Sequence, residues 1–327
     1  MSGARIRLVE ANPLTSVQDA GRRGAMRYGV SQSGPMDWVR FRLATALAGA
    51  PPGAFEVGLA GARFLAEGPV AVAVAGPGFE VRVGEVRFAA PVRLTIPDGA
   101  ELAIVPGRHG MWAYVAVAGI DLGAPLLGSY ATNVRTGLGA RDLSAWFPCD
   151  SGADASPALF ADPYDDDGPV GVLPGPQHHM FDAASRDRFV EAAWRITDQV
   201  DRMGYRLDGP GLSARRHDIV SDGVVEGAVQ VPGNGLPIVL MADRQPTGGY
   251  PKLAVLAAVD RPRLAQRRPG DTVRFEWTDA ATAAARRRAI VEATGSPAER
   301  VLREIDPTVL ATRNLVSGVW PAASEGL

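Results

Sequence analysis

The chain has 327 residues, of which 46% are hydrophobic and 21% charged, and its formal net charge is -2. This composition indicates a globular protein with a buried core, and the scattered basic residues exclude an electrostatic footprint for nucleic acid or an anionic membrane. Residues 1–12 alternate polar and apolar side chains, unlike a signal peptide, and no apolar run is long enough to span a bilayer. The single cysteine, Cys149, excludes an internal disulfide framework and has no evident histidine partner, so we interpret it as a packing residue in a cytoplasmic protein.

The first half of the chain is predicted to consist mainly of strands. Apolar or alternating segments occupy 70–74, 79–83, 86–88, 92–96, 102–104 and 113–118. Gly84-Glu85 separates the second from the third, and glycine at the first central position suits a type II′ hairpin turn. Closely spaced strands with turns between them predict a barrel or a sandwich.

One helix is predicted within this β-rich half. Ser33 is a candidate N-cap, Pro35 lies near the first turn, and Gly49 can end the helix. Apolar residues recur on one face between these two ends.

The segment 150–169 is the best candidate for a linker between two units. It contains Gly, Ser and Pro together with an acidic cluster, which we interpret as a solvated loop without a function: Asp162, Asp165, Asp166 and Asp167. Beyond it, 181–194 is predicted to be a helix, 229–231, 238–241 and 273–277 to be strands, and 280–294 to be a helix that begins after Thr278 or Asp279. We therefore expect a β-rich unit over 1–160, a second unit over 161–277, and a helical tail over 278–327.

Four segments concentrate charges, amides and glycines beyond what packing requires. They read SVQDAGR at 16–22 with GVSQSGPMD at 29–37, DRMGYRLDGP at 201–210, SDGVV at 221–225 with QVP at 230–232, and DRQPTGGYPK at 243–252. The last directly follows the apolar segment 238–241, and a polar cluster at the exit of a buried strand is a common place for site residues.

These segments resemble the biotin-dependent carboxyltransferase-like family, which includes the C component of 5-oxoprolinase (KipA) and the second allophanate hydrolase-type module of urea carboxylase. The resemblance extends in collinear order over about residues 5–277, including Glu56, the segment LPGPQ at 173–177 and RPGD at 268–271. Pro35, Ala118 and Pro246 depart from the usual pattern.

The resemblance implies a mainly β fold of two cyclophilin-like β-barrel units with a few helices. It also implies a hetero-oligomer with a first-subunit (KipI-like) homologue and a third oxoprolinase component. The implied reaction is ATP-dependent opening of the lactam 5-oxoproline to glutamate, a hydrolase activity of the complex. Urea carboxylase instead uses the related module to move a carboxyl group from carboxybiotin to urea.

Both reactions need donors that stabilise negative charge on a carbonyl or ureido oxygen. The candidate catalytic residues are Lys252, Arg244, Asp243, Arg202 and Asp201. The candidate substrate-binding residues are Gln18, Asp19, Arg22, Asp37, Asp222, Gln230, Gln245 and Tyr250. An alternative interpretation is that Asp19–Arg22 or Asp243–Arg244 are structural ion pairs that hold turns.

Lys252 is the only lysine of the chain. A chain that uses arginine at every other non-histidine basic position has a reason to keep a compact ammonium here. We predict that this ammonium contacts a substrate carboxylate, a carbonyl or a neighbouring aspartate in a space that is closed to guanidinium.

Several kinds of site are not indicated. The chain has no P-loop motif, so the ATP that the complex uses is not expected to bind here by that route. Lys252 follows Tyr250-Pro251, unlike the Met-Lys setting of a biotin acceptor, so we expect no covalent biotin. The four histidines show no metal-ligand spacing with cysteine or carboxylates.

Three functions remain open at this point. The chain is one component of an ATP-hydrolysing 5-oxoprolinase, the carboxyltransferase half of a urea carboxylase-type enzyme, or a non-enzymatic regulator that binds the first-subunit homologue.

Overall fold

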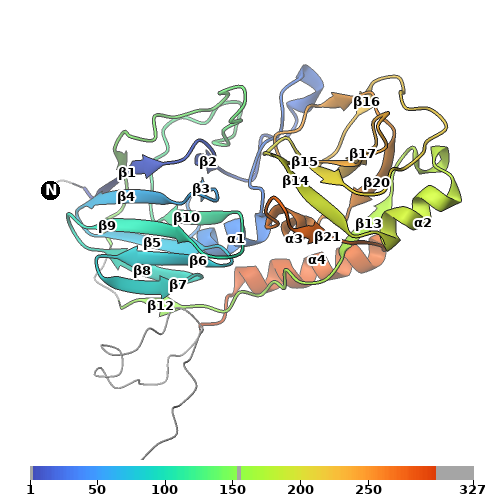
Figure 1. The fold of residues 1–327 in the computed structure, drawn as a ribbon. Helices are drawn as coiled ribbons and strands as arrows, with labels where there is room; N and C mark the ends of the chain where they lie inside the picture. The colour runs from blue at the N-terminus through green and yellow to red at the C-terminus, as the bar shows by residue number, and fades with distance from the viewer. Residues whose placement is uncertain (1–2, 153–155, 300–327) are drawn as a thin grey trace, which may run out of the picture.

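A computed structural model of the chain describes residues 3–152 and 156–299 (Figure 1). Strands dominate and a few helices lie between and beneath them, so the prediction of a mainly β protein is confirmed. Two β units lie side by side, the first built from the N-terminal half of the chain and the second from residues beyond the linker.

The first unit consists of two six-stranded sheets, in the orders β11-β1-β4-β9-β6-β7 and β12-β8-β5-β10-β3-β2. Their strands are β1 Arg5–Ala11, β2 Ser16–Gln18, β3 Ala54–Val57, β4 Ala62–Glu67, β5 Val70–Ala75, β6 Phe79–Val83, β7 Val86–Ala89, β8 Val92–Ile96, β9 Glu101–Pro106, β10 Ala113–Val117, β11 Phe147–Pro148 and β12 Ala158–Leu159. Alternate side chains of both sheets meet in one apolar core that includes Phe55, Phe64 and Val81. The predicted hairpin is confirmed, since Val83 pairs with Val86 and Gly84 has the positive φ that its turn requires.

The second unit is an eight-stranded sheet in the order β21-β14-β15-β18-β17-β20-β13-β22. Its strands are β13 Val170–Pro174, β14 Trp194–Val200, β15 Gly204–Asp208, β17 Ala228–Gln230, β18 Ile238–Leu240, β20 Lys252–Leu256, β21 Thr272–Val273 and β22 Phe275–Trp277. Only Arg274 separates the two edge strands in the sequence, so the sheet curls into a nearly closed barrel. A separate two-stranded ribbon pairs β16 Asp222–Gly223 with β19 Thr247–Gly248.

The α-helices are α1 Trp38–Leu47, α2 Ala183–Glu191, α3 Arg261–Ala265 and α4 Ala280–Gly295, and 3-10 turns are η1 Met26–Tyr28 and η2 His178–Met180. The predicted N-cap of the first helix was wrong. Asp37 caps α1 by accepting hydrogen bonds from two backbone N–H groups, whereas Ser33 lies four residues earlier with a φ of 55°. α4 begins directly after Asp279, as predicted, and the tail beyond residue 299 lies outside the described residues.

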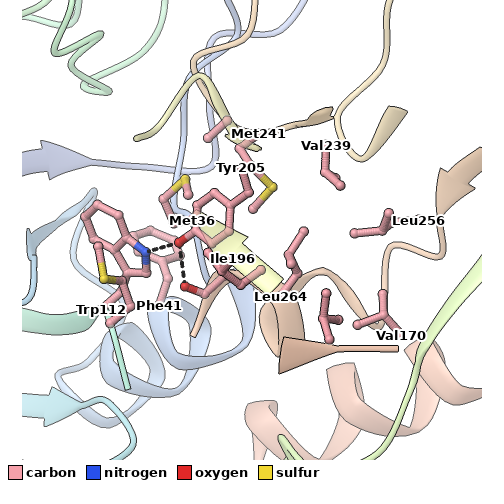
Figure 2. Packing of buried hydrophobic residues seen from close by; sticks show 14 of the residues in the cluster. Met36, Phe41, Trp112, Val170, Ile196, Tyr205, Val239, Met241, Leu256 and Leu264 are labelled. Atoms are coloured by element: carbon pink, nitrogen blue, oxygen red, sulfur yellow. Dashed lines mark hydrogen bonds between the residues drawn. The ribbon is translucent and has the colours of Figure 1, made fainter. Parts of the chain in front are cut away.

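The largest apolar cluster joins the two units. Figure 2 shows Trp112 and Phe41 of the first unit facing Tyr205 and Ile196 of the second. Trp112 Nε1 donates to Tyr205 Oη over 3.3 Å, and Tyr205 Oη donates to the Ala265 carbonyl over 2.8 Å. Because these polar atoms are paired across buried apolar surface, the junction resembles a domain core.

The acidic cluster of the linker is not simply a solvated loop. Asp162 and Asp166 bind the buried guanidinium of Arg40 over 2.8 and 2.6 Å, and Asp37 approaches it at 3.2 Å. Asp165 and Asp167 are both exposed, as expected of a loop. Burial raises the pKa of Asp166 to about 6, and the attraction of Arg40 offsets only part of that rise.

Candidate functional site

Arg202 forms a buried ionic cluster where the two units meet. It lies in the turn between β14 and β15 and is 2% exposed. Its Nε and Nη2 donate to the Asp243 carboxylate over 3.0 and 3.1 Å, and its Nη1 pairs with Glu56 of β3. Nη2 also donates to the Gly34 carbonyl over 2.7 Å. One guanidinium thus ties two carboxylates and a backbone carbonyl from both units together.

Glu56 is the member of this cluster that was absent from the candidate residues. Its Oε2 accepts from Tyr114 Oη and from the Met36 N–H, each over 2.8 Å. Burial raises the pKa of Glu56, and the attraction of Arg202 offsets part of that rise. The feature of the sequence that could have identified Glu56 is that it is the only carboxylate in strand β3, in which every residue is buried.

Two candidates of the first polar segment hold loops together. The Gln18 amide donates to Ser16 Oγ and the Thr132 carbonyl, and accepts from the Gly34 N–H. The Asp19 carboxylate accepts from the Gly21 and Tyr130 backbone N–H groups and from Ser129 Oγ.

Arg22 has the same kind of role. It is fully buried and donates to the Leu126 and Ala131 carbonyls. Asp19 and Arg22 do not pair with each other, so this alternative interpretation was wrong.

Asp37 and Asp201 also have local roles. Asp37 caps α1, and its second oxygen accepts from Arg40 and from the Gln266 amide. Asp201 is exposed and accepts from the Met203 and Gly204 N–H groups of its own turn. The structure does not bring either carboxylate to the residues that follow β18.

Arg244 is buried without a carboxylate partner. It is 3% exposed and forms no ion pair with any residue in the described ranges. Its Nη2 lies 3.4 Å from Gln32 Oε1 and 3.7 Å from Met26 Sδ, and its Nε has no hydrogen-bond partner there. Burial lowers the pKa of Arg244. The proposed Asp243–Arg244 ion pair is therefore wrong, because Asp243 is committed to Arg202.

Lys252 lies at the start of β20 and is 1% exposed. Its Nζ is 3.3 Å from Asp222 Oδ2, but the contact lacks the alignment of a regular hydrogen bond. Contact with this ammonium, and its charge, lower the pKa of Asp222. Gln230 pairs with Lys252 in the register of β17 and β20, and its buried Nε2 has no acceptor among the described residues.

The segment before Lys252 covers this pair of donors. A Cβ at Gly248 would collide with Gln230 Nε2, so glycine at this position permits the close approach. Gln177 contacts both members of this ion pair, because its Oε1 accepts from the Lys252 N–H over 3.1 Å and its side chain helps to lower the pKa of Asp222. Gln245 is half-buried and Tyr250 is 44% exposed, so both side chains are accessible to solvent.

The structure thus separates the candidates into two groups. One is the Glu56–Arg202–Asp243 cluster, which is saturated with internal partners. The other is the pair Lys252 and Gln230 with the exposed carboxylate of Asp222, which has unfilled donor capacity. Buried donor atoms of Arg22 and Arg244 also lack partners in the described part of the chain. We take the second group as the candidate active site because its two donors belong to residues paired on adjacent strands and one of them contacts the exposed carboxylate of Asp222.

Three further features of the described part of the chain concern metal ligands, membrane spans and the cysteine. No group of three or more His, Cys, Asp or Glu residues there could hold a metal ion. No helix there is long and apolar enough to cross a membrane. Burial raises the pKa of the Cys149 thiol to about 11, so it is protonated at neutral pH and a poor nucleophile.

Comparison with known proteins identifies relatives over most of the chain. It is 35% identical over 282 residues to the C component of 5-oxoprolinase from Escherichia coli, covering 83% of this chain and 90% of that protein. It is 31% identical to the Haemophilus influenzae protein of the same name, covering 86% and 94%. A putative urea carboxylase of Emericella nidulans is 27% identical, covering 84% of this chain but 24% of the longer protein.

Solved structures show the same fold. The Kluyveromyces lactis urea amidolyase superposes with a TM-score of 0.80 at 23% identity, covering 94% of this chain and 21% of that one. This chain therefore spans about a fifth of that structure. Residues 28–277 match the family described as carboxyltransferase domain, subdomain A and B. The chain belongs to this family and is a relative of the C component of 5-oxoprolinase.

Proposed function

We propose that this chain is the C component of an ATP-dependent 5-oxoprolinase and helps to open 5-oxoproline to glutamate together with partner subunits. One observation carries the proposal: the chain aligns with nearly the whole length of two proteins that bear this name. The urea carboxylase relative is less similar, and this chain corresponds to about a quarter of it.

The geometry of the candidate active site supports this reaction. Opening the lactam breaks the ring C–N bond and places negative charge on the carbonyl oxygen as water or its equivalent adds. A buried ammonium and a carboxamide N–H, both without a regular acceptor, are donors that such an oxygen or a substrate carboxylate can use. Lys252 and Gln230 supply this pair, and Gly248 allows the backbone of β19 to pack closely against Gln230.

The ATP used by the complex is proposed to bind elsewhere, because this chain lacks a P-loop motif. No covalent biotin is proposed, since Lys252 is buried and paired rather than presented on an exposed turn. We place the complex in the cytoplasm, in keeping with a chain whose single cysteine allows no internal disulfide.

A carboxyltransferase half of a urea carboxylase-type enzyme is the second candidate, favoured by the similarity to the putative urea carboxylase. Carboxyl transfer needs the same stabilisation of charge on a ureido oxygen, so Lys252 and Gln230 would have the same role. A regulator that binds the first-subunit homologue without turnover is the third.

Reconstitution separates the three functions. The full chain is mixed with its first-subunit homologue and the third component, and glutamate release from 5-oxoproline is measured with and without ATP. The proposal predicts release that requires ATP and stops when this chain is omitted. Product formation from urea that depends on biotin would support the carboxyltransferase, and tight partner binding without turnover in either assay would support the regulator.

A further inference from the structure

Two buried donors belong to paired residues of the barrel in the second unit. Lys252 and Gln230 are partners on adjacent antiparallel strands and are 1% and 2% exposed. Lys252 Nζ and Gln230 Nε2 both lack a regular hydrogen bond to the residues described. An unpaired buried donor is costly, and most such groups in folded proteins have a partner. Two such donors on paired residues of adjacent strands indicate a place for an acceptor from outside the barrel.

The group that now neutralises Lys252 is poorly suited to be its permanent partner. The side chain of Asp222 is 52% exposed, whereas that of Lys252 is 2% exposed. A buried cation with a solvated anion is an asymmetric pair, because water competes for the carboxylate but not for the ammonium. Asp222 can therefore leave at a lower cost than Lys252 can be left without any anion.

Asp222 lies on the β16–β19 ribbon, which we expect to open more easily than the barrel. The ribbon of β16 and β19 has two residues in each strand and lies outside the eight-stranded sheet, at the upper edge of the second unit in Figure 1. Short two-stranded ribbons are marginal by themselves and open locally at low free-energy cost. Gly248 of β19 faces Gln230, so the ribbon covers both donors together.

We propose that Lys252 and Gln230 form a subsite for a ligand carboxylate, and that Asp222 occupies it in the ligand-free protein. The ligand carboxylate displaces Asp222, so that one oxygen meets the ammonium and the other the carboxamide N–H. One cation beside one neutral donor matches the charge of a carboxylate better than that of a phosphate dianion. That the ligand is 5-oxoproline rests on the proposed function, whereas the subsite itself does not.

The single lysine makes the test direct. The full chain is labelled with ¹³C at the lysine ε carbon, which places the one labelled side chain at Lys252. The resonance is followed during titration with sodium acetate at constant ionic strength, with acetamide as the neutral analogue. The variant is Asp222→Asn, and Asp218→Asn removes an exposed carboxylate of the same segment as the matched control.

Acetate is expected to give a saturable shift, and acetamide none. If Asp222 covers the subsite about nine-tenths of the time, Asp222→Asn binds acetate ~10-fold more tightly, because apparent affinity scales with the uncovered fraction. Asp218→Asn is expected to match the wild type. An Asp222→Asn chain that binds acetate no more tightly than the wild type, or a resonance that acetate does not saturate, overturns the proposal.

The same titration with 5-oxoproline and with 2-pyrrolidone, the lactam that lacks the carboxylate, separates this inference from the proposed function. Acetate binding in the expected pattern supports the subsite even if 5-oxoproline does not bind, and that result would count against 5-oxoproline as the substrate. Turnover by the reconstituted complex with no acetate effect in either chain would uphold the function and overturn the subsite.

Discussion

Replacing Arg202 with methionine removes the cation that two buried carboxylates share at the junction of the units. Glu56 would keep its hydrogen bonds from Tyr114 and the Met36 N–H, and Asp243 would keep the one from the Val134 N–H. Neither would keep a counter-charge, since Arg202 is the ion-pair partner of both. Methionine fills much of the same volume, so the change tests charge more than packing.

The expected loss in the free energy of unfolding is about 3–5 kcal/mol at neutral pH, the usual cost of leaving a buried ion pair without one partner. Burial already raises the pKa of Glu56, and the loss of Arg202 raises it further. A folded-state pKa above the unfolded value contributes stability that is present at low pH and lost as pH rises through the folded pKa. The deficit of the variant should therefore be smaller near pH 5 than near pH 7.

Urea denaturation followed by tryptophan fluorescence measures this loss, with Arg206→Met as the matched control. Arg206 is exposed on β15, so its replacement should change stability by less than about 0.5 kcal/mol. Adding Asp243→Asn to Arg202→Met should recover part of the loss, because it removes one of the stranded charges. A loss for Arg202→Met below about 1 kcal/mol, the range of an exposed ion pair, would refute the reasoning.

Three further predictions concern the candidate site and the linker. Lys252→Arg keeps the charge but not the compact shape, and is expected to reduce glutamate release by the reconstituted complex about 100-fold; wild-type turnover would contradict it. Gly248→Ala places a methyl group against Gln230 and should lower turnover, whereas Gly249→Ala, whose Cβ would meet its nearest atoms at 3.6 Å, should not; equal effects of the two would count against the close approach. Lowering the pH from 7 to 4 should raise the free energy of unfolding of the wild-type chain by about 1–3 kcal/mol, because the folded pKa of Asp166 is raised to about 6 and protonation therefore favours the folded state. Asp166→Asn should abolish this rise. Thermal denaturation across this range checks it, and an unchanged pH profile would contradict it.

The strands of the first unit follow from local sequence patterns. Val92, Leu94 and Ile96 alternate with Arg93 and Thr95, and β8 buries the first set as a strand with one apolar face must. The Gly84 turn was predictable for the same reason, because a positive φ is a property of one residue and its neighbours.

The start of α1 shows where local signals become ambiguous. Ser33 and Asp37 are both good N-cap residues, and Pro35 suits a first turn after Ser33. The chain begins its helix after Asp37 because that carboxylate also meets Gln266 and Arg40. Gln266 lies 229 residues away, so the sequence near α1 contains no sign of it.

The acidic linker and the ionic cluster depend on contacts of the same long range. Asp166 has the local features of a solvated loop residue, yet Arg40, 126 residues earlier in the chain, holds it. Glu56 and Arg202 are 146 residues apart. The pattern of one sequence shows periodicity over a few neighbouring residues. It does not show which distant residues the folded chain brings into contact.

The sequence by itself determined the mainly β character, the family motifs and the singular status of Lys252, because composition, alternation and short motifs are local properties. The tertiary structure alone decided which polar residues have partners and which lack them. It assigned Asp243 to Arg202 and left Arg244 without an ion pair among the residues described. It also set Asp222 over Lys252 and Gly248 over Gln230. Those outcomes depend on how the barrel closes and how the β16–β19 ribbon lies upon it, since strand pairing between distant segments sets the neighbours of each side chain.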